Sequence, residues 1–96
     1  MSLQINYNAG IYEIQGMLNT ENSVYLELQL QNIIEYSSGV VISLDKVEMI
    51  DEYTTKSVAS LQERAQGNNK VFFIIGKKNK KVCDQFNALN LNHLLM

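Results

Sequence analysis

The sequence contains one cysteine, no proline and no tryptophan among its 96 residues. Cys83 has no second thiol to pair with, which excludes an internal disulfide and favours a reducing compartment. The first twenty residues lack the basic segment followed by an apolar segment that marks a secretion signal. The longest unbroken apolar run is Val71–Ile75, far short of the roughly 20 residues of a membrane helix. We therefore expect a cytoplasmic protein without membrane insertion.

The residues that are present are typical of one folded globular domain spanning residues 1–96. Apolar residues make up 46% of the chain and charged residues 19%. A chain of this length buries roughly 60 to 65% of its unfolded surface. The net charge of −2 hides an uneven distribution. Residues 1–52 carry eight acids and one lysine, whereas residues 53–96 carry seven bases and two acids, so we expect a polarised surface that can steer a charged partner.

The first half of the chain predicts a β-hairpin followed by a helix. Residues 3–7 and 11–15 alternate between apolar and polar side chains, and Asn8, Ala9 and Gly10 between them favour a tight turn. Residues 22–36 fit two patterns, because their leucines alternate as in a strand and also share one helical face. The length, the helix-forming residues and the candidate caps at Asn19, Thr20 and Asn22 favour a helix.

The second half predicts strands that alternate with helices. Residues 40–44 and Val71–Ile75 are short, β-branched or aromatic apolar runs, typical of central strands that are buried on both faces of a parallel sheet. Residues 53–66, closed by Gly67, and residues 80–89 have helical spacing. The predicted order is ββαβαβα, an α/β fold with a mixed, mostly parallel four-stranded sheet and about three helices.

Asp51 and Glu52 stand where a predicted central strand leads into a helix. Ligand and partner sites gather beyond the carboxyl ends of such strands. A carboxylate in the first turn of a helix is also favoured by the helix dipole, so capping explains the pair without any function. Catalysis by the pair would need further polar groups converging on it, and no His, Cys or Arg motif lies nearby in the sequence. We expect no enzymatic activity.

Hydroxyl groups and lysines provide the remaining candidates. Thr54, Thr55 and Ser57 fall in the first turns of the same predicted helix, where they either accept a phosphate or satisfy backbone donors. A cluster of lysines either contacts phosphate or is a solvated loop entering a helix, and without interleaved aromatic residues it does not favour nucleic-acid binding. The members of this lysine cluster are Lys77, Lys78, Lys80 and Lys81.

The other polar candidates indicate no cofactor. His93 has no metal-ligand spacing to Cys83 or to a carboxylate, so we expect a surface histidine and no metal site. Cys83 lies on the apolar face of the last predicted helix, as an inert core residue does. Gly76, Lys77 and Lys78 lack the upstream glycine and the following Ser or Thr of a nucleotide-binding loop.

Several segments together resemble the STAS domains of anti-sigma factor antagonists. Residues 40–51 resemble the strand and approach segment of that family. Residues 16–19 (Gly-Met-Leu-Asn) are similar to its Gly-x-Leu-Asp turn, and residues 89–95 to its closing segment. Leu26, Leu30 and Ile33 match the core positions of the family's first helix.

The resemblance is imperfect at the family's phosphorylation motif, Asp-Ser-Ser-Gly. Asp51 is kept, but Glu52 stands at the phosphoacceptor serine, Tyr53 at the second serine and Thr54 at the glycine. Glu52 has no hydroxyl and carries one negative charge where a phosphoserine carries about −1.5 to −2. Either Glu52 permanently mimics a phosphorylated serine, or this position is not used as a phosphorylation switch. Ser43 also replaces a strand aspartate that many members carry.

The resemblance implies a non-catalytic interaction module without cofactors. Such a module docks on an anti-sigma factor that is also a serine kinase, or on another signalling protein. The implied docking residues are Asp51, Glu52, Tyr53, Thr54, Thr55 and Lys56, with Thr54 and Thr55 as candidate phosphorylation sites.

Two alternative functions and the oligomeric state stay open. The chain is alternatively the STAS subunit of an ABC lipid-transport complex. A nucleotide- or lipid-binding STAS domain that uses the lysine cluster is the other alternative. The sequence does not decide between a monomer and a homodimer.

Overall fold

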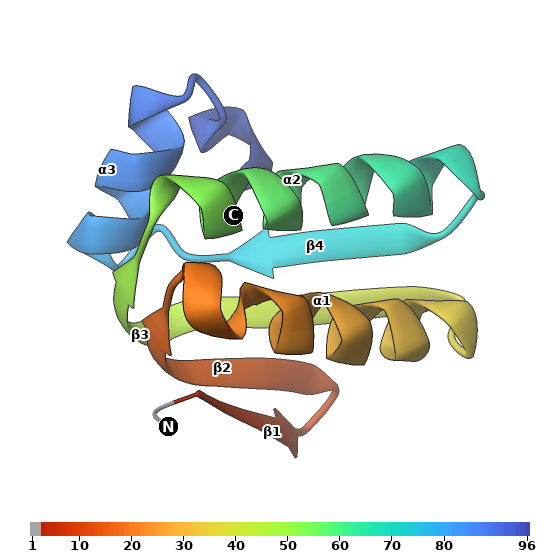
Figure 1. The fold of residues 1–96 in the computed structure, drawn as a ribbon. Helices are drawn as coiled ribbons and strands as arrows, with labels where there is room; N and C mark the ends of the chain where they lie inside the picture. Colours follow the sequence, from red (N-terminus) through yellow and green to blue (C-terminus); the bar gives the residue numbers. More distant parts are fainter. Residues whose placement is uncertain (1–2) are drawn as a thin grey trace.

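The computed structural model describes residues 3–96, and its elements follow the predicted order ββαβαβα (Figure 1). The strands are β1 (Gln4–Asn8), β2 (Ile11–Leu18), β3 (Gly39–Ile50) and β4 (Val71–Ile75). The helices are α1 (Thr20–Glu35), α2 (Glu52–Gly67) and α3 (Lys80–Ala88), followed by the short 3-10 helix η1 (Asn92–Leu94).

The strands form one mixed sheet in the order β1-β2-β3-β4. β1 and β2 are antiparallel and pair up to Asn8 and Ile11, so that Ala9 and Gly10 alone form the turn. The φ angles of these two residues are 52° and 87°, as in the type I′ turn whose twist suits a two-residue hairpin. β2, β3 and β4 run parallel, because a helix carries the chain back between them. The predicted mixed, mostly parallel sheet is confirmed.

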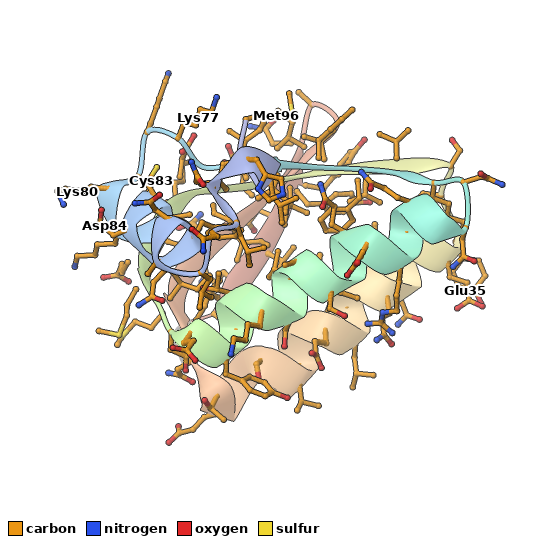
Figure 2. The ribbon with its side chains drawn as sticks, turned by 90° about the horizontal axis from the view of Figure 1, so that it is seen from above. Glu35, Lys77, Lys80, Cys83, Asp84 and Met96 are labelled. Atoms are coloured by element: carbon orange, nitrogen blue, oxygen red, sulfur yellow. The ribbon has the colours of Figure 1, made fainter. Side chains whose placement is uncertain are left out.

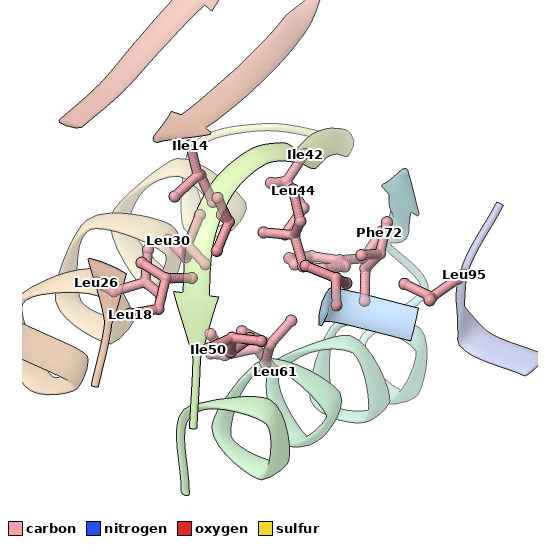
Figure 3. Close-up of a cluster of buried hydrophobic side chains, with 14 of the residues drawn as sticks. Ile14, Leu18, Leu26, Leu30, Ile42, Leu44, Ile50, Leu61, Phe72 and Leu95 are labelled. Atoms are coloured by element: carbon pink, nitrogen blue, oxygen red, sulfur yellow. The ribbon is translucent and has the colours of Figure 1, made fainter. Parts of the chain in front are cut away.

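Both crossover helices lie on the same face of the sheet (Figure 1). The right-handed connections from β2 to β3 and from β3 to β4 advance in the same direction, which places α1 and α2 side by side. α3 packs against β3 and beside α2. Helices and sheet enclose one cluster of buried side chains (Figure 3). It includes Ile14, Leu18, Leu26, Leu30, Ile42, Leu44, Ile50, Leu61, Phe72 and Leu95.

Burial along the central strands differs from the prediction of strands buried on both faces. β3 does lie between β2 and β4. Its side chains alternate, however, with Ile42 and Leu44 buried and Val41 and Ser43 only partly buried. In β4, Phe73 is 46% exposed. The prediction was wrong here because the helices of residues 3–96 cover one face of the sheet.

β3 is also longer than predicted. The prediction ended this strand at Leu44, whereas β3 continues to Ile50. The register against β2 shifts between Ser43 and Lys46. Over this stretch β3 advances by three residues while β2 advances by two, which is a β-bulge in β3. Such a bulge interrupts the apolar alternation that marks a strand in the sequence.

Asn79 braces this bulge from a distant part of the chain. Its side-chain nitrogen donates to the carbonyl oxygens of Leu44, Asp45 and Val47 at 3.1, 3.3 and 2.7 Å. Its side-chain oxygen accepts from the backbone of Lys81 and so caps α3. One amide therefore fixes the bulge of β3 and the start of α3 together.

α1 confirms the prediction of a helix for the ambiguous segment. It begins at Thr20, two residues earlier than predicted, because Asn19 is the N-cap. The Asn19 side chain accepts from the backbone of Glu21 and Asn22, and the Asn22 side chain accepts from the Asn19 N–H at 3.0 Å. This reciprocal capping box satisfies donors that the first turn leaves unpaired.

Candidate functional site

The predicted docking segment begins α2 and lies next to the start of α1. β2 and β3 are parallel neighbours, and their last residues, Leu18 and Ile50, are paired. The Asp51 N–H continues the ladder by donating to the Leu18 carbonyl oxygen at 3.0 Å. Each strand is followed at once by a helix. The first turns of α1 and α2 therefore meet at the end of the sheet where β2 and β3 terminate.

The Asp51 carboxylate joins these two helix starts. Its Oδ1 accepts from the Thr54 N–H at 2.9 Å, which makes Asp51 the N-cap of α2. Its Oδ2 accepts from the Thr20 N–H at 2.8 Å and from the Thr20 hydroxyl at 3.0 Å. A single carboxylate therefore satisfies donors of both first turns and fixes their relative position.

These hydrogen bonds determine the ionisation of Asp51. Partial burial raises the pKa of the carboxyl, but the polar groups of Thr54 and Thr20 lower it more, and the pKa lies below its ordinary value of 3.8. The Thr54 hydroxyl oxygen has no hydrogen-bond partner, so the hydrogen bonds that lower the pKa of Asp51 come from the Thr54 N–H, the Thr20 N–H and the Thr20 hydroxyl. Asp51 is therefore a fixed negative charge at neutral pH.

Thr54 and Thr55 point into the protein. Both side chains are 0% exposed. The Thr55 hydroxyl donates to the Asp51 carbonyl oxygen at 2.8 Å, inside the first turn of α2. A kinase needs an accessible hydroxyl, so this burial weighs against both residues as phosphorylation sites in this fold. It also removes them from direct contact with a docked partner.

Glu52, Tyr53 and Lys56 are the parts of the predicted segment that face outward. Tyr53 is 52% exposed. The side chains of Glu52 and Lys56 are 66% and 60% exposed and form an ion pair of 3.2 Å, one helical turn apart. The outward surface thus has one aromatic ring beside two opposite charges.

One further residue belongs to this site and was predicted from the sequence only as a candidate cap. Thr20 reaches the site through its hydrogen bonds to Asp51. The order of the strands is the signal that reveals Thr20, because adjacent parallel strands bring the starts of their following helices together.

Asp51 and Glu52 do not converge as a catalytic pair. Both oxygens of Asp51 accept hydrogen bonds from helix starts, whereas the Glu52 carboxylate points outward to Lys56. General acid–base chemistry by two carboxylates requires both of them to face one reacting group. The geometry therefore favours a capping role for Asp51.

The lysine cluster follows β4, at the end of the sheet where the parallel strands terminate. All four lysines are exposed, in the loop before α3 and in its first turn. Lys80 pairs with Asp84 at 2.8 Å, and that carboxylate raises the pKa of Lys80. Figure 2 shows Lys77, Lys80 and Asp84 on one side of the molecule, far from Glu35. Acidic and basic side chains are mixed on the surface, because Glu13 pairs with Lys46, Glu52 with Lys56 and Asp84 with Lys80, so the expected polarised surface is not seen in these pairs.

The remaining candidates have structural surroundings. His93 is exposed. Cys83 is partly buried, with its sulfur 3.5 Å and 3.4 Å from the carbonyl oxygens of Gly76 and Lys77. Across residues 3–96, no three His, Cys, Asp or Glu side chains are grouped to hold a metal ion. In that same range, each helix is too short or too polar to span a bilayer.

Comparison with known proteins identifies the architecture. Residues 1–95 match the family model described as the STAS domain. A search of curated proteins finds no match. Among solved structures, the chain is similar to an anti-sigma factor antagonist from Mycobacterium paratuberculosis, with a TM-score of 0.79 and 15% identity, over 98% of this chain and 81% of that one.

Two forms of one further protein have the same fold. The unphosphorylated anti-sigma factor antagonist SpoIIAA gives a TM-score of 0.76 at 11% identity, covering 99% of this chain and 86% of that chain. The phosphorylated form of the Bacillus cell fate determinant SpoIIAA gives 0.71 at 10% identity, covering 99% and 89%. At such low identity, the similarity concerns the fold.

Proposed function

The chain belongs to the STAS domain family, and we propose that it is a non-catalytic interaction module of the anti-sigma factor antagonist type. In this proposal it docks on an anti-sigma factor that is also a serine kinase. The observation that carries the proposal is the Asp51 carboxylate, which fixes the starts of α1 and α2 together. Glu52, Tyr53 and Lys56 are thereby presented on a rigid support.

The chemistry of this surface suits protein docking. A half-exposed tyrosine gains much contact area at a small cost in side-chain entropy, and tyrosine is enriched among residues that dominate binding energy. The charges of Glu52 and Lys56 lie beside Tyr53, where they favour one orientation of a complementary partner.

Glu52 makes this docking independent of phosphorylation at its own position. In the alignment implied by the family motif, Glu52 replaces the serine that a partner kinase modifies. Its side chain is exposed and has no hydroxyl to receive a phosphate, so the partner meets the same surface with or without ATP. Thr54 and Thr55, the nearest hydroxyls, are buried.

A binding measurement with two tyrosine variants tests the docking surface. Serine-kinase anti-sigma factors from the same cell are titrated against the wild-type chain, Tyr53→Ala and Tyr36→Ala. Tyr36 is the matched control, because it is 84% exposed and lies at the other end of α1. We expect Tyr53→Ala to weaken binding about tenfold or more, with Tyr36→Ala unchanged. Failure of every such kinase to bind would contradict the proposal, as would equal loss in both variants.

Incubation with a bound kinase and ATP tests the missing switch. We expect no stoichiometric phosphate on the chain and no change in affinity. Mass spectrometry that finds stoichiometric phosphate on Thr54 or Thr55 would show that the start of α2 opens to the kinase, and this part of the proposal would then be wrong.

A further inference from the structure

The two edge strands of the sheet, β1 and β4, differ in whether another segment of residues 3–96 pairs with their outer side. At the β4 edge, Leu95 pairs with Ile74 in a parallel bridge, and the Met96 N–H donates to the Ile74 carbonyl oxygen at 2.8 Å. At the other edge, β1 pairs with β2 on its inner side, and no segment within residues 3–96 pairs with its outer side. Figure 1 shows β1 at this rim of the molecule.

The hairpin register identifies which backbone groups of β1 point outward. In a two-residue type I′ hairpin, the residues that flank the turn, Asn8 and Ile11, form a hydrogen-bonded pair. Hydrogen-bonded and non-hydrogen-bonded pairs then alternate along an antiparallel ladder. Asn6, which faces Glu13, therefore bonds to β2, whereas the N–H and C=O groups of Ile5 and Tyr7 point away from the sheet.

β1 lacks the features that usually protect an exposed edge. Its five residues contain no charge, no proline and no bulge, and these are the devices that discourage pairing with another strand. The side chains of Gln4, Asn6 and Asn8 lie on the face of the sheet away from the helices, and those of Ile5 and Tyr7 lie on the helix face, opposite Ile14 and Tyr12.

We propose that β1 pairs antiparallel with β1 of a second copy, about a two-fold axis at Asn6. This register places Ile5 opposite Tyr7 of the second copy, so that their outward N–H and C=O groups form four backbone hydrogen bonds. The side chains are self-complementary, with an aliphatic–aromatic pair on the helix face and amide pairs on the other face. A register centred on Ile5 or Tyr7 would overlap only three residues of each strand, because Asn6 is the middle residue of the five.

The proposed interface is small, so the dimer is weak. A pair of five-residue strands buries less than the roughly 1,200 Å² of a standard interface. Association is therefore expected to depend on concentration and to be rapid in exchange. The two sheets then continue as one, with all crossover helices on the same face, because the two-fold axis is perpendicular to the sheet.

Hydrogen exchange of single amides tests the pairing directly in the wild-type chain. The Ile5 and Tyr7 amides should become protected as the concentration rises from about 10 µM to about 1 mM, whereas the Asn6 and Asn8 amides stay equally protected throughout. Rapid exchange of Ile5 and Tyr7 at every concentration would overturn the proposal. Protection that does not depend on concentration would also overturn it, because another part of the same chain would then cover the edge.

Sedimentation of charge variants tests the register. Asn6→Lys places two lysines opposite each other at the axis and should weaken the dimer about tenfold or more. Within one copy the introduced lysine faces Glu13, so the fold keeps an oppositely charged neighbour. Gln4→Lys is the matched control. In the proposed dimer the two lysines that it introduces, one in each copy of the chain, lie about 13 Å apart, beyond the screening length of about 8 Å.

The supporting outcome is a loss of the dimer in Asn6→Lys alone, restored when that variant is mixed with Asn6→Glu. Equal association of the wild-type chain and both lysine variants would show that another surface mediates it. Equal loss in both variants would show that the axis does not lie at Asn6. Either result would overturn the proposal.

Discussion

The two ends of the helix pair α1 and α2 are stabilised by hydrogen bonds with side chains of opposite charge. At the end where both helices begin, the Asp51 carboxylate accepts from Thr20 and Thr54. At the end where α1 stops, the Lys70 ammonium donates to the carbonyl oxygens of Ile34 and Glu35 at 2.6 and 2.8 Å. Each fastening matches the helix dipole, which is positive at the start and negative at the end.

The two ends differ in where the stabilising group comes from. α1 has no basic residue in its last turn, so Lys70 supplies the donor for carbonyls that the helix leaves unpaired. That end forms a hollow of about 270 Å³, partly lined by Gln31, Glu35 and Arg64. The Asp51 end presents Tyr53 outward, at 52% exposure, and Tyr36, the C-cap of α1 at the other end, is 84% exposed. An exposed ring therefore does not distinguish the two ends, and the docking proposal rests on the first turn of α2, where Asp51 joins both helix starts.

Removing the carboxylate should have the largest effect on stability. Asp51→Ala leaves the first turns of α1 and α2 without their shared acceptor and should lower the free energy of unfolding by about 2 kcal/mol. Asp51→Asn is the matched control, because its amide oxygen still caps α2 while its amide nitrogen cannot accept from Thr20. Urea denaturation should rank the wild type above Asp51→Asn and Asp51→Ala lowest. Equal stability of all three would contradict the role given to this carboxylate.

Removing the cation at the other end should cost less. Lys70→Met keeps much of the aliphatic stem but loses two hydrogen bonds to helix carbonyls, which should lower the free energy of unfolding by about 1 kcal/mol. Lys77→Met, at an exposed loop lysine, controls for the loss of charge. If thermal denaturation gives both variants the same midpoint, Lys70 does not fasten α1.

Acid should weaken the Asp51 end selectively. The pKa of Asp51 in the fold lies below its ordinary value of 3.8, so the unfolded chain binds the proton more tightly than the folded chain. The stabilisation by Asp51 is thus complete above about pH 4 and is lost as the pH falls through the lowered pKa. Unfolding curves between pH 2 and pH 6 should show a smaller acid loss in Asp51→Asn than in the wild type. Parallel curves would contradict this linkage.

The ion pair on the proposed docking surface should matter least for stability. Glu52 and Lys56 are both well exposed, and pairs of this kind contribute about 0.3 to 0.5 kcal/mol. Lys56→Ala should therefore leave the denaturation midpoint almost unchanged. A loss above about 1 kcal/mol would show that the pair also supports the fold.

The order of elements was predictable because each segment carries its own period and its own end signals. α1 shows the limit of periodicity, since its leucines fit a strand and a helix equally. Length and caps decided for the helix, and Asn19 is indeed the N-cap. The extension of β3 was not predictable, because the bulge after Ser43 hides its period. Asn79, which braces the bulge, lies 35 residues beyond Leu44 in the chain.

The site was only partly predictable. Asp51 was expected as a cap, but its bond to Thr20 depends on the order of the strands. The burial of Thr54 could have been inferred, because Thr54, Val58 and Leu61 follow the i, i+4, i+7 spacing of a buried helical face. That Thr55 is buried beside it depends on how α2 packs against the sheet.

The most direct test of the docking proposal maps the surface of the isotope-labelled chain by NMR while an unlabelled serine-kinase anti-sigma factor is added. We expect the amide signals of Glu52, Tyr53 and Lys56 to shift or broaden at equimolar partner, whereas those of Glu35 and Lys70 stay unchanged. Perturbation confined to Glu35 and Lys70, or no perturbation at either end, would contradict docking at the start of α2.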